Sequence, residues 1–119
     1  AFEVQPAFCT LLRSIDDDRL IVVEDSAENL PLYLKKLGAE KADQIISAIP
    51  FVLVPKEEAQ RIVEVSRDHL AHNGRFVQIH YSTLLKPFYQ GIFDRVKINF
   101  CALNIPPAFV FHCSGTAID

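Results

Sequence analysis

Polar side chains follow three strand-like stretches of this chain, at the points where the stretches end. Glu3 closes the first stretch, Asp25 and Ser26 with Ala27 follow the second, and Ser47 ends the third. In open α/β sheets the carboxyl ends of parallel strands meet at one edge, where ligands bind. An acid placed like Glu3 can accept hydrogen bonds from both hydroxyls of a ribose, and residues 25–27 can meet an adenine ring. Taken singly, each residue is more typical of an ordinary turn, so a nucleoside site is predicted only by the joint pattern.

The segment from Ser47 to Phe51 is where we expect the reacting groups. Asp43 and Gln44 lead into residues 45–49, an apolar run that only Ser47 interrupts, as in a parallel strand with helices on both faces. Pro50 cannot donate to a sheet ladder, so regular pairing should stop there, and Pro55 suits the start of the next helix. The alternative, which spacing alone favours, is a buried strand followed by an ordinary connection.

His80 and Tyr81 end a later strand and face the same predicted crevice or its rim. The pair can position a substrate or supply a base, and an interior tyrosine with a satisfied hydroxyl is an equally good interpretation. His69 and His72 are three residues apart on a predicted helix, but no third ligand has suitable spacing, so we expect no metal site. The sequence contains neither a Gly-rich phosphate loop nor a Gly-x-Ser-x-Gly elbow.

The hydrophobic pattern predicts an α/β fold that positions these residues in one domain over residues 1–119. Apolar residues at helical spacing indicate helices from Pro6 to Ile15, from Leu30 to Leu37 and from Pro55 to about Leu70. Gly38 and the run His72-Asn73-Gly74 are the expected stops. The predicted strands are residues 1–4, 19–24, 42–49, 75–81, 93–103 and 108–113. Because the last two are joined by a short connection, a mostly parallel sheet should close in an antiparallel hairpin.

Composition limits the classes of partner and compartment. The 119 residues carry a net charge of −3, and their 12 Lys and Arg residues are dispersed, so we expect no nucleic-acid partner. The three cysteines are odd in number and form no Cys-x-x-Cys pair, which predicts reduced core thiols in a cytoplasmic protein. No apolar run reaches the roughly 20 residues that span a bilayer.

Five blocks in order together resemble class I S-adenosylmethionine-dependent methyltransferases, and most of all the bacterial phospholipid N-methyltransferases that methylate phosphatidylethanolamine. The blocks are Glu3–Phe8, Val23–Leu30, Ala42–Pro50, Leu70–Tyr81 and Asn104–Phe109. They cover nearly the whole chain, and the ordered series is far more specific than any one block. The resemblance implies a Rossmann-like sheet and S-adenosylmethionine as cofactor.

The resemblance also implies roles for individual residues. Glu3 would bind the cofactor ribose, and Ser26 and Ala27 would lie beside the adenine. Val4 and Ser47 are further predicted cofactor-binding residues. Such enzymes usually carry Asp at the position of Ser26, so the adjacent Asp25 is expected to substitute. The segment from Ser47 to Pro50 would lie beside the transferred methyl group.

Family members carry a first strand, a Gly-rich loop and a helix before the position of Glu3, and this sequence does not include them. In the family sheet the first strand lies between the strands that end at Glu3 and Ser47. Its absence should expose two unpaired edges and leave an isolated monomer unstable. We therefore expect an upstream segment, or a second copy in a homo-oligomer, to complete the sheet.

The predicted function is methyl transfer from S-adenosylmethionine to an amine, with a phospholipid head group as candidate acceptor and peripheral contact with a membrane. In-line displacement on a sulfonium needs alignment more than a strong base. Ser47, Pro50 and Tyr81 are the predicted catalytic residues, and Phe51, His80 and Tyr81 should wall the acceptor site. The alternatives are a noncatalytic fragment or interaction module that cannot bind the cofactor alone, and an RNA adenine methyltransferase. Residues 47–50 lack the Asn-Pro-Pro-Tyr expected of the latter.

Overall fold

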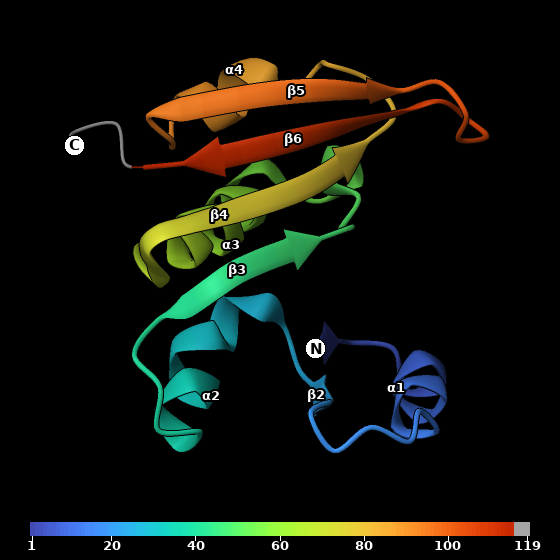
Figure 1. Cartoon of the computed structure of the whole chain (residues 1–119), viewed down its shortest axis with the longest axis vertical. Helices are drawn as coiled ribbons and strands as arrows, with labels where there is room; N and C mark the ends of the chain where they lie inside the picture. Colours follow the sequence, from blue (N-terminus) through green and yellow to red (C-terminus); the bar gives the residue numbers. More distant parts are fainter. Residues whose placement is uncertain (116–119) are drawn as a thin grey trace.

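The strands form two separate sheets in the computed structural model, which describes residues 1–115. The smaller sheet pairs β1 (Phe2–Glu3) in parallel with β2 (Val23–Glu24). The larger sheet has the order β3-β4-β6-β5 (Figure 1). Its strands are β3 (Ala42–Ser47), β4 (Leu70–His80), β5 (Arg95–Cys101) and β6 (Ala108–Ser114). β3 and β4 are parallel and β6 is antiparallel to β4 and β5, so the predicted α/β sheet with a final hairpin is confirmed.

Within residues 1–115, four α-helices and two short 3-10 helices connect the strands. They are α1 (Pro6–Arg13), η1 (Ala27–Asn29), α2 (Leu30–Lys36), η2 (Phe51–Leu53), α3 (Lys56–Asp68) and α4 (Lys86–Gln90). Pro6 begins α1 as predicted, because a first-turn residue has no intrahelical use for its N–H. Gly38 ends α2 with a φ of +74°, which glycine adopts without strain.

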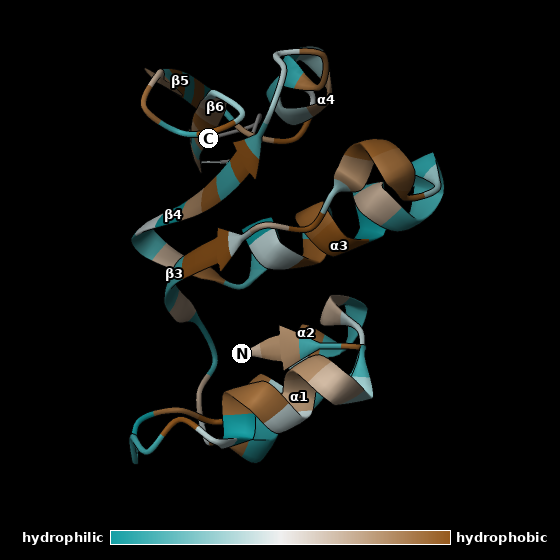
Figure 2. Ribbon diagram, turned by 90° about the vertical axis from the view of Figure 1, so that its right-hand side faces the viewer, coloured by the Kyte–Doolittle hydropathy of each residue, from teal (hydrophilic) through white to brown (hydrophobic). Residues whose placement is uncertain are grey.

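The hydrophobic core lies between the larger sheet and the helices α3 and α4. Figures 1 and 2 show both helices on the same side of β3 and β4. Val63 of α3, Tyr89 of α4 and Phe111 of β6 are completely buried there, and the rings of Phe76 and Phe93 stack at 5.7 Å. The predicted helical face of α3 is confirmed, because Ala59, Ile62, Val63 and Ser66 are its buried residues.

The opposite face of the larger sheet is open in the described residues. Ile45 packs against the core, whereas the next residue, Ile46, is 82% exposed. Side chains alternate between the two faces of a strand, so Ile46 belongs to the open face. The expectation that helices cover both faces is therefore wrong for residues 1–115.

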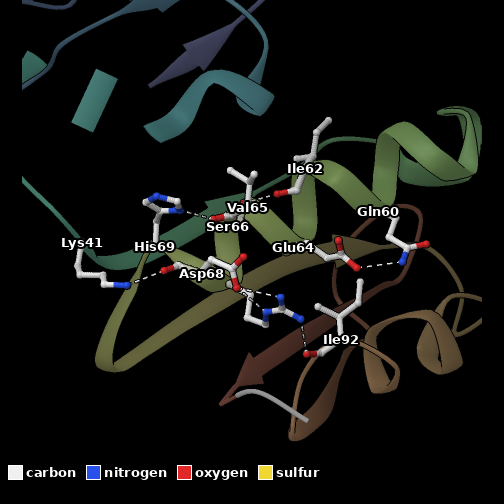
Figure 3. Close-up of polar contacts among 10 residues, drawn as sticks. Lys41, Gln60, Ile62, Glu64, Val65, Ser66, Asp68, His69 and Ile92 are labelled. Carbon is white, nitrogen blue, oxygen red and sulfur yellow. Dashed lines mark hydrogen bonds and ion pairs between the residues drawn. The ribbon is translucent and has the colours of Figure 1, made fainter. Parts of the chain in front are cut away.

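The boundary between α3 and β4 differs from the prediction. The helix ends at Asp68, and β4 starts at Leu70 rather than at residue 75. Contacts with the start of β3 extend the strand, since Ala42 N donates to His69 O and Lys41 Nζ donates to Asp68 O (Figure 3). The pairing register then shifts between Ala42 and Gln44.

Gly74 lies in this irregular part of β4 and does not end the helix as predicted. A Cβ atom there would lie 2.8 Å from Asp43 O and 3.0 Å from Ala71 O. The glycine therefore permits close contact between two backbones, which is a packing requirement that local helix signals do not reveal.

The second predicted strand is much shorter than expected. Residues 19–24 were expected to be extended, but only Val23 and Glu24 pair, opposite Phe2 and Glu3. Arg19 instead closes a turn, in which its N–H and guanidinium donate to Asp17 Oδ1. A β-branched run forms a strand only where a neighbouring strand can hydrogen-bond to it, and β1 is only two residues long.

The edges of β1 and β3 face a cavity of about 290 Å³. Its walls include Phe2 of β1, the preceding Ala1, and Gln44 to Ser47 from β3. The split into two sheets falls between the strands that end at Glu3 and Ser47, as predicted from the sequence.

The cysteines are free thiols, and they differ in burial. Cys9 and Cys113 are buried, in agreement with the prediction of core residues, whereas Cys101 is exposed at the end of β5. Among residues 1–115, no helix combines the length and the apolar character needed to cross a membrane.

Candidate active site

The carboxyl ends of β1, β2 and β3 meet around one pocket. Its volume is about 290 Å³, and Glu3, Val4 and Pro50 contribute to its wall. Residues 25–27 line the same pocket. The structure thus brings together five of the six predicted cofactor residues, while the sixth, Ser47, lines the neighbouring cavity between β1 and β3.

Glu3 is held with one carboxylate oxygen engaged and the other available. Its Oε1 accepts hydrogen bonds from the backbone N–H groups of Val4 and Gln5, at 2.9 and 3.0 Å. These contacts orient the carboxylate at the start of α1. Oε2 has no partner among residues 1–115, so it can accept hydrogen bonds from hydroxyl groups of a ligand in the pocket.

Asp25 supports the pocket wall through its own hydrogen bonds. Oδ1 accepts from Ser26 N and from Asn29 Nδ2, and Oδ2 accepts from the hydroxyl of Tyr33 at 2.9 Å. The bonds from Asn29, Tyr33 and Ser26 lower the pKa of Asp25, so it is ionised at neutral pH. Both oxygens already hold the start of α2, which leaves Asp25 less free to meet an adenine than the sequence suggested.

Ser26 and Ala27 form the turn between β2 and α2. Ser26 is the N-cap of η1, where its Oγ accepts a hydrogen bond from Glu28 N at 3.2 Å. Ala27 packs against the core cluster and lines both this pocket and the cavity beside β3. The small side chain of Ala27 allows the pocket at the strand ends and the cavity beside β3 to lie next to each other.

The turn after β3 is held from both strands of the central pair. Ser47 Oγ accepts from Ile49 N at 3.2 Å, and Gln78 Nε2 donates to Ile49 O at 2.8 Å. Ser47 and Gln78 are partners in the β3–β4 register. They orient the backbone that leads into Pro50, which lines two pockets.

Gln78 is a positioning residue whose role was not predicted from the sequence. It is completely buried, and its Oε1 has no hydrogen-bond partner among residues 1–115. The available signal was period-two alternation, since Phe76, Gln78 and His80 share the core face of β4. A glutamine at a core position must find partners inside the protein.

A second hollow of about 220 Å³ lies next to Pro50, at the carboxyl ends of β3 and β4. We call it the acceptor crevice, after the acceptor site expected from the sequence; its wall is formed by Ala48, Pro50, Val52, Ile79, His80, Tyr81 and Ser82. Three predicted residues therefore meet there: Pro50, His80 and Tyr81. Tyr81 is 59% exposed, so its ring stands at the rim rather than in the interior.

His80 is held by a buried tyrosine. Its Nε2 lies 2.8 Å from the hydroxyl of Tyr89, and burial raises the pKa of Tyr89 far above its ordinary value. Because the hydroxyl stays protonated and has no other partner within residues 1–115, it can donate a hydrogen bond to Nε2. Burial lowers the pKa of His80, which favours the neutral ring. His80 thus has one nitrogen committed to structure, and its role as a base stays a prediction.

Phe51 is placed away from the acceptor crevice. It is 3% exposed, belongs to the core cluster, and lines a separate apolar hollow beside α4. Ile49 and Pro50 turn the chain so that Val52, rather than Phe51, reaches the crevice.

Residues 1–115 contain no group of three His, Cys, Asp or Glu side chains in reach of one metal ion. His69 Nδ1 lies 2.8 Å from Val65 O, and the two are drawn in Figure 3.

This arrangement matches the fold of solved methyltransferases, so the predicted Rossmann-like methyltransferase fold is confirmed. An rRNA methylase from Streptococcus thermophilus superposes with a TM-score of 0.67 at 20% identity, covering 98% of this chain and 72% of that one. A protein from Streptococcus mutans, described as a candidate methyltransferase and solved in complex with SAH, gives 0.61 at 15% identity, covering 95% and 73%. At such identities the likeness shows the fold alone.

A curated sequence relative is an ornithine lipid N-methyltransferase from Singulisphaera acidiphila. It is 34% identical over 116 residues, which are 95% of this chain and 60% of the relative. The chain therefore spans about 60% of the length of that protein. No family model matches the sequence.

The comparisons bear differently on the two predicted acceptor classes. The name of the sequence relative agrees with the predicted class of lipid amine methyltransferases. The prediction that no nucleic acid takes part is not supported, because structural neighbours include rRNA methylases.

Proposed function

We propose that this chain supplies the nucleoside half of an S-adenosylmethionine site and the acceptor crevice of a lipid amine N-methyltransferase. The observation that carries the proposal is the pocket in which Glu3, Asp25 and Pro50 meet from three different strand ends. The proposal also rests on the relationship to a lipid N-methyltransferase. The acceptor is an amine on a lipid head group.

The residues of the pocket fit the nucleoside part of the cofactor. The free Oε2 of Glu3 is an acceptor for ribose hydroxyls, and Ala27, Ile49 and Ile62 offer an apolar wall to a purine. When bound, S-adenosylmethionine supplies a methyl group already activated on a sulfonium. Glu3 orients the ribose, and Pro50 separates the cofactor pocket from the acceptor crevice, since it lines both.

The acceptor crevice aligns the amine and excludes water. The clamped Ile49 backbone holds Pro50 in place, and Ile79 with Val52 makes the wall apolar. Tyr81 presents a π face that favours a developing alkylammonium. His80 is neutral, so it does not repel a cationic product. Alignment and desolvation are the main requirements of an in-line displacement.

The cavity between β1 and β3 is proposed to receive a strand from outside residues 1–119. The backbone N–H and C=O groups at the facing edges of β1 and β3 have hydrogen-bonding capacity for another strand. One inserted strand would pair with both edges and join the two sheets. Such a strand comes either from an upstream segment of the same protein or from a second copy. Residues 1–119 would then be part of one methyltransferase domain.

Calorimetric titration with S-adenosylhomocysteine tests the cofactor site. The protein should be titrated in its natural length, together with any segment that precedes Ala1. Micromolar binding supports the proposal, whereas no heat at millimolar ligand supports the alternative of a noncatalytic fragment or interaction module. Transfer of a labelled methyl group from the cofactor to lipid vesicles or to RNA then identifies the acceptor. If the label appears on the RNA and not on the lipid, the proposal of a lipid amine as acceptor is rejected.

A further inference from the structure

Three loops leave the larger sheet at the edge that holds the acceptor crevice. β3 and β4 are parallel, and β6 is antiparallel to both β4 and β5, so β3, β4 and β5 run in the same direction. Their arrowheads point the same way in Figure 1. The loops that follow them, residues 48–55, 81–85 and 102–107, therefore lie along one edge. With strands about 4.8 Å apart, β5 lies about 10 Å from β4.

Each loop exposes large apolar side chains at its tip. We call this set the apolar rim; its members and exposed fractions are Val52 52%, Leu53 81%, Tyr81 59%, Leu84 73%, Leu103 96% and Ile105 96%. The first two loops are contiguous, because Val52 lines the acceptor crevice with Tyr81 and a neighbouring apolar hollow with Leu84. Isolated exposed leucines are ordinary, but a group around one opening marks an interaction surface.

Two lysines flank the apolar tips. Residues 48–56, 81–87 and 102–107 contain Lys56 and Lys86 but no Asp or Glu, and Glu57 and Glu58 follow Lys56 in the first turn of α3. Apolar tips with lysines beside them suit the interface of a bilayer that contains anionic lipid.

We propose that the apolar rim docks this protein on a lipid bilayer and places the acceptor crevice against the head groups. The inference rests on the proposed lipid acceptor and adds the surface through which the protein reaches it. Leu53, Leu84 and Leu103 enter the interfacial layer from three loops, and Lys56 and Lys86 meet phosphates. An amine on a head group then enters the crevice beside Tyr81 without leaving the membrane.

Vesicle sedimentation tests the rim with a matched control. Phosphatidylcholine vesicles containing phosphatidylglycerol are mixed with the natural-length protein, with a Leu53→Gln/Leu103→Gln variant, and with a Leu32→Gln/Leu37→Gln variant. Leu32 and Leu37 are 49% and 55% exposed on and after α2, outside the rim. The rim variant should bind roughly tenfold or more weakly, because two leucines no longer leave water. The control should bind like the wild type.

A fluorescent reporter locates the contact directly, because residues 1–119 contain no tryptophan. In a Leu103→Trp variant, brominated lipid should quench the added signal, whereas the signal of a Leu37→Trp variant should persist. Equal vesicle binding by the rim and control variants, or equal quenching at both positions, would overturn the proposal. So would a protein dimer that the rim substitutions dissociate in the absence of vesicles.

The outcome is separable from that of the proposed function. The rim residues substituted here do not line the nucleoside pocket, so the rim variant should retain its affinity for S-adenosylhomocysteine. Loss of vesicle binding with intact cofactor affinity supports docking through the rim. If the rim variant binds both vesicles and the cofactor as well as the wild type does, docking through the rim is rejected and the proposed function is not.

Discussion

Ser47 and Gln78 are paired across β3 and β4, and their side chains hydrogen-bond to the N–H and the C=O of the same residue, Ile49. A turn that begins with Pro50 would otherwise have no ladder to fix it. The two side chains thereby convert the end of a strand into a rigid wall between the nucleoside pocket and the acceptor crevice.

Replacing Gln78 should loosen this wall. A Gln78→Leu substitution removes the side-chain donor to Ile49 O and leaves only the N–H of Phe51 there, so the free energy of unfolding should fall by about 0.5–1.5 kcal/mol. The KM for the methyl acceptor should rise as well, because the turn borders the crevice. Urea unfolding and steady-state kinetics measure the two effects. Gln60→Leu is the control, since Gln60 is exposed and bonds only Glu64; an equal effect in both variants would refute the clamp.

Replacing Glu3 should weaken cofactor binding without unfolding the protein. A Glu3→Gln substitution keeps the shape but removes the charge, so the affinity for S-adenosylhomocysteine should fall roughly 10- to 100-fold. Glu40→Gln, in the exposed loop before β3, should leave the affinity unchanged. Calorimetry measures both variants, and equal affinities in the two would remove Glu3 from the site.

The pKa of His80, which burial lowers, predicts an acid-sensitive fold. In the unfolded chain His80 binds a proton below its ordinary pKa of 6.5, whereas the folded protein resists that proton. Stability should therefore be fully present above pH 6.5 and decline as the pH falls through the lowered folded pKa. Thermal unfolding between pH 8 and about pH 5 measures this slope.

A pair of histidine variants assigns that slope. His80→Gln should flatten the dependence of the melting temperature on pH, while His72→Gln, at an exposed position in β4, should leave it unchanged. If the slope persists in the His80→Gln variant, another group causes it.

Adding a methyl group at Gly74 should destabilise the start of β4. The new Cβ of a Gly74→Ala variant would lie 2.8 Å from Asp43 O, so the backbones of β3 and β4 must separate locally. We expect a loss of about 1–3 kcal/mol in the free energy of unfolding. Gly91→Ala is the control, since its nearest contact would be an ordinary 3.5 Å. Equal melting temperatures for the two variants would contradict the close approach.

The sequence by itself determined the order of elements, their faces and the class of fold. Period-two and helical patterns depend on local spacing, so the burial of Val63 on α3 and the antiparallel hairpin of β5 and β6 could be predicted from residue types. The residues at strand ends could also be predicted, because parallel strands bring their carboxyl ends to one edge.

Only the tertiary structure decided which of the predicted site residues line the nucleoside pocket, the acceptor crevice or the core. It also decided where the strands end. Phe51 was expected at the acceptor and lies in the core, because the turn held by Ser47 and Gln78 sends Val52 to the crevice instead. Residues 19–22 were expected in a strand, but Arg19 and Leu20 close a turn with Asp17, and within residues 1–115 the one contact of Ile21 with the neighbouring strand is from the N-terminal amine of Ala1. Pairing and turn direction depend on contacts between segments far apart in the chain, which local patterns do not encode.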